Sequence, residues 1–167
     1  QFAMHYMLST PESCQNFLRN VSETTKVGGY FIGTCYDGET VFRMLRSTSP
    51  GESLAIMDGD RKLWEVVKRY ERDDFPANAA SLGYAIDVYQ ESINKMAREY
   101  LVNFEYITRL LENYGLVLIE REEAKQLGLP ASSGMFTELF GEMNTNISRD
   151  RRLRNQYGNA PGMTEYE

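Results

Sequence analysis

The opening segment of the chain, QFAMHY, carries residue types that could form a binding site. Its polar and aromatic side chains are Gln1, Phe2, His5 and Tyr6, and His5 is the single histidine of the chain. Each has an ordinary structural interpretation as well. A lone histidine beside aromatic rings is usually hydrogen-bonded and partly buried, and isolated aromatic residues belong more often to a core. The segment alone therefore indicates a candidate site and leaves both interpretations open.

Charged residues elsewhere give weaker signals. Glu99, at the start of a predicted helix, is by itself typical of a solvated first-turn carboxylate. Four arginines could contact RNA phosphates, but the net charge of −6 favours a solvated loop. These arginines are Arg149, Arg151, Arg152 and Arg154. The aspartates of the chain lack the spacing of a calcium loop, so the sequence predicts no metal site.

The composition is that of one soluble globular domain. With 167 residues, 42% of them hydrophobic and 25% charged, the chain can bury a sizeable core. No apolar run approaches the roughly 20 residues of a membrane span, and no signal-peptide pattern is present. Cys14 and Cys35 lack disulfide or zinc spacing and are interpreted as reduced intracellular thiols. The acidic net charge argues against a surface that grips long nucleic acid, yet it permits a pocket for one nucleotide.

The first part of the chain predicts a helix, a strand and a second helix. The first helix covers residues 9–29, with Thr10 or the residue before it as its cap and the Gly28–Gly29 pair as its end. Residues 30–36 predict a short buried strand, and residues 38–46 predict a short helix. This order is typical of a parallel α/β sheet.

The following residues, 51–99, predict β structure. Two β-like runs flank the DGD sequence at 58–60, which suggests a hairpin. Residues 81–93 form a third extended run. Trp64 and Tyr70 on the hairpin are expected to pack rather than to stack on bases.

The remainder predicts one strong helix over residues 99–115, which Gly115 ends. A strand is predicted at 116–120. Residues 121–167 are polar, with one short helical piece at 136–140 and a loop-like tail.

Several segments together resemble a known family. QFAMHY, a helix, GGYFIGT, EYLVNF and ENYGL occur in this order, and they are similar to the messenger RNA cap guanine-N7 methyltransferases. The similarity is of the kind found in the methyltransferase domains of large DNA virus mRNA-capping enzymes. Two departures concern positions near the glycine pair. Val27 stands where the family usually has proline, and Cys35-Tyr36 stands where many cellular members have Thr-Pro, so the wall of the cap pocket there is expected to be shaped differently.

The resemblance implies a Rossmann-like class I methyltransferase fold. No glycine-rich cofactor loop follows a strand in this sequence, so we expect the C-terminal part of such a domain, without its N-terminal cofactor-binding strands and inactive alone. The expected divisions are a helix-strand-helix core (1–50), a β insertion over the cap pocket (51–99), a helix and strand (100–120) and a polar tail (121–167). Such a partial domain would leave an unpaired strand edge.

The resemblance also implies an activity, which is transfer of a methyl group from S-adenosylmethionine to guanine N7 of the RNA cap. N7 carries a lone pair and no proton, so the reaction needs positioning and electrostatics and no general base. No residue is therefore expected to act as an acid, base or nucleophile. Capped RNA is the implied partner, with other capping-enzyme domains or a stimulatory subunit, in the nucleus or, for a viral protein, in the cytoplasm or virion.

The resemblance assigns a role to each candidate residue. Gln1 and Tyr6 would contact S-adenosylmethionine. Phe2, His5, Glu99 and Tyr36 would bind the cap guanine, and Glu99 would accept hydrogen bonds from guanine N1–H and the exocyclic amine. Two alternatives stay open: a class I methyltransferase that acts on another nucleotide or small molecule, and a non-catalytic methyltransferase-like module that binds a partner.

Overall fold

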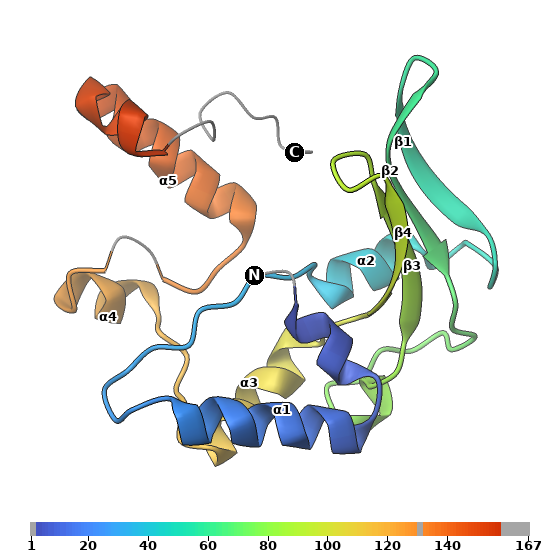
Figure 1. The fold of residues 1–167 in the computed structure, drawn as a ribbon, viewed down its shortest axis with the longest axis horizontal. Helices are drawn as coiled ribbons and strands as arrows, with labels where there is room; N and C mark the ends of the chain where they lie inside the picture. The colour runs from blue at the N-terminus through green and yellow to red at the C-terminus, as the bar shows by residue number, and fades with distance from the viewer. Residues whose placement is uncertain (1–2, 130–131, 158–167) are drawn as a thin grey trace. The chain divides into compact units, whose positions relative to one another are not determined.

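The computed structural model describes residues 3–129 and 132–157. The chain divides into two compact units, Gln1–Val117 and Leu118–Glu167, and each is described by itself (Figure 1). Both α-helices and β-strands are present, which confirms the predicted mixed α/β class.

The first unit contains a four-stranded sheet. Its strands are β1 (Ser53–Asp58), β2 (Arg61–Lys68), β3 (Ala85–Gln90) and β4 (Lys95–Tyr100), in the order β1-β2-β3-β4. Every neighbouring pair is antiparallel. The predicted hairpin and third strand are confirmed. The expected parallel sheet is not what the described residues form, because residues 30–36 form no strand and every strand pair of the described sheet is antiparallel.

The three α-helices of the first unit begin at polar caps. The helices of this unit are η1 (Met4–Leu8), α1 (Pro11–Thr24), α2 (Gly38–Met44), η2 (Ala79–Ser81) and α3 (Phe104–Asn113), with η marking 3-10 helices. The side chains of Thr10, Asp37 and Asn103 accept hydrogen bonds from backbone N–H groups in the first turns of α1, α2 and α3. Each cap satisfies an N–H group that has no partner within its helix.

Two predicted helix boundaries are wrong. Helix α1 ends at Thr24 rather than at Gly28, because the hydroxyls of Thr24 and Thr25 donate to the carbonyls of Asn20 and Val21 and satisfy the last turn. Helix α3 begins at Phe104, five residues after the predicted start. The intervening residues belong to β4 and to the connection that follows it.

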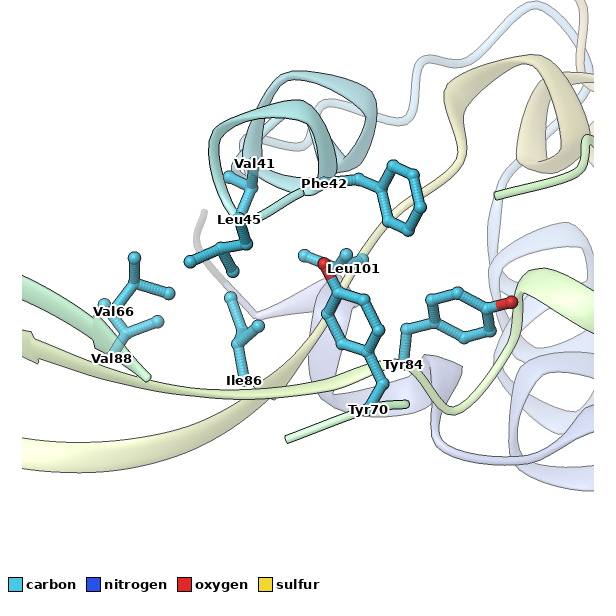
Figure 2. Close-up of a cluster of buried hydrophobic side chains, with 9 residues drawn as sticks. All are labelled: Val41, Phe42, Leu45, Val66, Tyr70, Tyr84, Ile86, Val88 and Leu101. Carbon is cyan, nitrogen blue, oxygen red and sulfur yellow. The ribbon is translucent and has the colours of Figure 1, made fainter. Parts of the chain in front are cut away.

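The main core lies between α2 and one face of the sheet. Figure 2 shows this cluster, in which residues of α2 point toward residues of the strands: Val41, Phe42, Leu45, Val66, Ile86 and Val88. Tyr70, Tyr84 and Phe75 extend the cluster with aromatic rings that stack near Phe42. The predicted packing role of Tyr70 is therefore confirmed.

Lys68 binds backbone carbonyl groups at and beyond the C-terminal end of α2. Its side chain is buried, and its Nζ donates to the carbonyl oxygens of Leu45 at 3.2 Å and Thr48 at 3.0 Å. A cation at a helix C-terminus satisfies carbonyls that lack an intrahelical partner and complements the helix dipole.

A second core joins the N-terminal helices to α3. Leu8 of η1, Cys14 and Leu18 of α1, and Ile107 of α3 are buried around Val102. Gly38 approaches this region closely, since its N–H donates to the Val102 carbonyl at 3.1 Å. The second core therefore ties η1 and the start of α2 to the residues that follow β4. Both cysteines are free thiols.

The two segments predicted as strands at 30–36 and 116–120 are not strands in the described structure. A strand requires a neighbour that completes its backbone hydrogen bonds, and the four strands of the sheet pair only with one another. Several of their apolar side chains are open to solvent. Ile32 is 79% exposed and Val117 is 74% exposed.

The second unit is more helical than predicted. It contains α4 (Arg121–Gln126), α5 (Phe136–Arg149) and η3 (Arg151–Tyr157). The predicted short helical piece is the first part of α5, which is 14 residues long in total. An ion pair of 3.0 Å between Arg121 and Glu142 joins α4 to α5. The loop-like tail predicted after 140 is therefore wrong as far as Tyr157.

Candidate functional site

His5 and Glu99 meet in the interior of the first unit. His5 lies on η1, which packs against β4, the strand that carries Glu99. The His5 Nε2 and Glu99 Oε2 atoms are 3.5 Å apart, and the two residues are only 3% and 8% exposed. Both ring nitrogens of His5 and the Oε2 of Glu99 are buried without a hydrogen-bond partner among the described residues. Buried polar atoms are nearly always satisfied in folded proteins, so this unsatisfied pair is a candidate functional site.

Burial drives both members of the pair toward their neutral forms. Loss of solvation lowers the pKa of His5 from 6.5 to about 4 and raises the pKa of Glu99 from 4.5 to about 7. Although the two groups are close enough for an ion pair, His5 is therefore neutral at neutral pH and Glu99 is poised to lose its proton. The prediction that Glu99 lies at the start of a helix is wrong, because Glu99 belongs to β4.

Tyr6 and Cys35 lie near the same carboxyl group. The ring of Tyr6 is tilted against that of His5, with centroids 4.2 Å apart, and it is 41% exposed. Burial first, and then the charge of Glu99, raise the pKa of Tyr6. The pKa of Cys35 rises to about 12 through burial, with smaller contributions from Asp37 and Glu99. Cys35 is therefore a protonated thiol and not a nucleophile at neutral pH.

Tyr36 joins the site to the sheet. Its hydroxyl accepts a hydrogen bond from Trp64 Nε1 of β2 at 3.1 Å and another from Gln90 Nε2 of β3. Its ring packs against the main core. Burial raises the pKa of Tyr36, the two hydrogen bonds lower it, and Glu99 raises it further. Tyr36 thus lies within electrostatic reach of Glu99.

The structure brings together four of the six residues predicted to form the site, and these are His5, Glu99, Tyr6 and Tyr36. Gln1 and Phe2 lie outside the described residues.

The arginine cluster belongs to the second unit, which is described by itself. Arg152 pairs with Asp150 at 2.9 Å.

In the described ranges, no group of three or more histidine, cysteine, aspartate or glutamate residues could hold a metal ion. None of the described helices has the length and apolar character needed to cross a membrane.

Sequence reasoning missed the contribution of β2 and β3. The sequence predicts only a packing role for Trp64, whereas its indole N–H also donates to the Tyr36 hydroxyl. No sequence pattern predicts a role for Gln90. Trp64 and Gln90 are direct partners in the β2–β3 ladder, and cross-strand partners lie on the same face of a sheet. The missing signal was the register of the two strands.

This arrangement suits recognition of a flat base with adjacent N–H donors. A buried carboxyl group that ionises near neutral pH can accept two such donors, and the imidazole of His5 can donate to or accept from the same ligand. Aromatic rings of Tyr6 and Tyr36 lie near that carboxyl. With Cys35 protonated, the described residues favour binding and electrostatic stabilisation over covalent catalysis.

The sequence of this chain is similar to those of known proteins. Residues 1–159 match the family model of the mRNA (guanine-N(7))-methyltransferase domain. A probable mRNA-capping enzyme of Acanthamoeba polyphaga mimivirus is 30% identical over 164 residues, which cover 95% of this chain and 12% of the viral protein.

Cellular relatives match a shorter region. The mRNA cap guanine-N(7) methyltransferase of Saccharomyces cerevisiae is 27% identical over 72% of this chain and 28% of its own length. The mRNA cap guanine-N(7) methyltransferase 1 of Oryza sativa is 31% identical over 71% of this chain and 31% of its own length. The chain thus spans less than a third of each of these relatives. The family model covers nearly the whole chain, and the chain therefore belongs to the mRNA (guanine-N7)-methyltransferase family.

Proposed function

We propose that this chain binds the guanine of an RNA cap and takes part in methyl transfer to guanine N7. The observation that carries the proposal is the buried His5–Glu99 pair, whose polar atoms have no partner in the described structure. The family supports the same activity, since the cellular relatives named above are cap guanine-N(7) methyltransferases. Capped RNA is then the substrate of the full-length protein.

Guanine complements Glu99. It presents two adjacent donors, N1–H and the exocyclic amine, and one carboxylate can accept both. Adenine has an acceptor at N1 and no amine at C2, so the same carboxylate disfavours it. The bound donors stabilise the ionised form of Glu99, and the resulting negative charge stabilises the cationic N7-methylated base. His5 hydrogen-bonds the base, and Phe2 and Tyr36 pack beside it.

The methyl group is supplied by S-adenosylmethionine. Of the two residues proposed to contact it, Tyr6 is described, and its exposed ring lies against His5, which supports a contact beside the proposed guanine site. Gln1 would supply the other contact. The residues of the chain hold the acceptor in line and move no proton, because guanine N7 carries none. Positioning of this kind can supply several kcal/mol of the barrier reduction.

Two segments with exposed apolar side chains support a larger fold. We propose that residues 30–36 and 116–120 are strands of a Rossmann-like class I methyltransferase sheet. Their open apolar side chains, among them Ile32 and Val117, are what strands covered on both faces would carry. In this arrangement the described antiparallel sheet is the β insertion over the cap pocket. The neighbouring strands and the glycine-rich cofactor loop would come from the rest of the full-length protein.

Methyl transfer by the full-length protein tests this function. The protein is incubated with methyl-labelled S-adenosylmethionine and, in separate reactions, guanosine-capped RNA, adenosine-capped RNA or a panel of small-molecule acceptors. The digested RNA product is analysed for N7-methylguanosine. The proposal expects label in N7-methylguanosine and none with adenosine-capped RNA. Label only in small-molecule acceptors would assign another methyltransferase activity. Cap binding without label would assign a non-catalytic module.

A further inference from the structure

Three residues from separate parts of the chain meet at one oxygen atom. The Tyr36 hydroxyl accepts hydrogen bonds from Trp64 and Gln90, which face each other across the β2–β3 ladder. The rings of Tyr36 and Trp64 are also in edge-to-face contact, with centroids 6.2 Å apart and an interplanar angle of 63°. These contacts hold the far end of the Tyr36 side chain.

The backbone beside Tyr36 is held as well. Two residues later, the Gly38 N–H donates to the Val102 carbonyl at 3.1 Å. The approach is so close that a Cβ atom on Gly38 would lie 2.4 Å from the Val102 oxygen. Val102 is three residues beyond Glu99. One end of Tyr36 is therefore anchored near the Glu99 end of β4, and the hydroxyl is anchored at Trp64 and Gln90.

Tyr36 and Glu99 also share one face of the sheet. Glu99 pairs with Ile86 across the β3–β4 ladder, and Ile86 points into the main core. Gln90 lies four residues from Ile86 on the same strand, so its side chain projects from the same face. The ring of Tyr36 packs against this core. It thus lies over the face that carries Glu99.

We propose that Trp64 and Gln90 are positioning residues of the cap-guanine site, which fix the Tyr36 ring as a rigid wall beside Glu99. This inference rests on the proposed function. A tyrosine ring that is already held in place loses little conformational freedom when a base packs against it. Loss of either donor would free the ring and weaken cap binding, while the contacts to the methyl donor would stay intact.

Kinetics of single-donor variants in the full-length protein test the proposal. Trp64→Phe and Gln90→Leu each remove one donor and keep an apolar side chain in its place. Tyr89→Phe is the matched control. Tyr89 precedes Gln90, and its hydroxyl binds Asn94 at 3.0 Å, while its side chain projects from the opposite face.

Each donor variant should raise the KM for capped RNA by about 5- to 30-fold. The KM for S-adenosylmethionine and kcat should change by less than about 2-fold, as should all constants of Tyr89→Phe. In the Trp64→Phe/Tyr36→Phe double variant, the effects should not add, because both changes remove the same hydrogen bond. Equilibrium binding of a labelled guanosine cap analogue should weaken in parallel.

Two results would overturn the inference without touching the proposed function. One is an active wild-type protein whose donor variants keep the wild-type KM for capped RNA, whatever their melting temperatures. The other is a fall of kcat in the donor variants while the KM values for capped RNA and S-adenosylmethionine stay unchanged, which would indicate loss of folded protein. A wild-type protein that neither binds nor methylates the cap would instead reject the proposed function, and this inference with it.

Discussion

Burial controls the protonation of the two groups at the centre of the candidate site. His5 and Glu99 are both withdrawn from water, and neither gains a hydrogen bond from the described residues. The carboxyl group is therefore held near its point of ionisation, with its pKa raised to about 7. A ligand with two N–H donors would shift this balance toward the carboxylate, so binding and ionisation are coupled.

This state of Glu99 predicts a pH dependence of stability. Because burial raises the pKa of Glu99 in the folded state from 4.5 to about 7, ionisation favours the unfolded chain. The contribution of protonated Glu99 to the free energy of unfolding is fully present at pH values below its unfolded pKa. It is lost as pH rises through the folded pKa. Glu99→Gln removes this dependence. The variant should therefore gain stability relative to wild type between about pH 5 and about pH 8, by about 1–3 kcal/mol.

Chemical denaturation at several pH values measures this difference. His5 has a lowered pKa, so its contribution to the free energy of unfolding is lost as pH falls from 6.5 through about 4. That contribution is present in both proteins and cancels to first order in the comparison. A constant difference between Glu99→Gln and wild type over this range would show that the Glu99 pKa is not raised.

At the scale of single elements, the aromatic cluster under α2 makes a paired prediction. The Tyr70 hydroxyl is buried without a hydrogen-bond partner in the described structure, whereas the Tyr84 hydroxyl donates to the Asp74 carbonyl at 3.0 Å. Tyr70→Phe should leave the free energy of unfolding unchanged or raise it, because it removes an unsatisfied polar atom. Tyr84→Phe should lower it by about 0.5–1.5 kcal/mol. Urea denaturation of both variants gives the comparison, and the reverse order would contradict the described hydrogen bonding.

The start of α2 makes a second prediction. A Cβ on Gly38 would meet the backbone of Val102 at 2.4 to 2.8 Å, and backbone atoms cannot yield as a side chain can. Gly38→Ala should destabilise the protein by about 1–3 kcal/mol or more. Gly141→Ala is the matched control in α5, because nothing lies within 4 Å of its added Cβ. It should be neutral or stabilising by up to about 1 kcal/mol. Equal melting temperatures for the two variants would argue against the close approach.

Local signals in the sequence were sufficient for some elements and not for others. Thr10 and the proline after it mark the start of α1, because capping depends on a few adjacent residues. Strand β4 escaped prediction because its sequence, KMAREY, is poor in β-branched residues and owes its conformation to pairing with β3. The same logic explains residues 30–36, whose composition suits a strand but which have no strand partner among the described residues.

The candidate site shows the same division. The resemblance placed His5, Tyr6, Tyr36 and Glu99 in one site, and the structure brings these four together. Their environments could not be predicted in the same way. The raised pKa of Glu99 follows from its burial on a strand, and the contacts of Trp64 and Gln90 follow from strand register. Both depend on residues that are distant in the sequence.

At the scale of the whole molecule, the first unit holds His5 and Glu99 where elements of its two cores meet. The core under α2 supports the sheet, and the core around Val102 joins η1, α1 and α3 to the end of β4. His5 enters from η1 and Glu99 from β4, so neither core alone would form the site. Stability of the junction between these cores should therefore control activity as well as folding.

The central claim is that Glu99 selects guanine, and its most direct test is the kcat/KM for guanosine-capped RNA in Glu99→Ala of the full-length protein. Loss of the carboxylate leaves two guanine donors unpaired at about 1–3 kcal/mol, so we predict a fall of about 10- to 100-fold. Glu99→Gln should recover part of it, because an amide oxygen still accepts a hydrogen bond. Glu105→Ala, at an exposed glutamate of α3 that pairs with Arg109, should match wild type. Near-normal kcat/KM in Glu99→Ala would contradict the account.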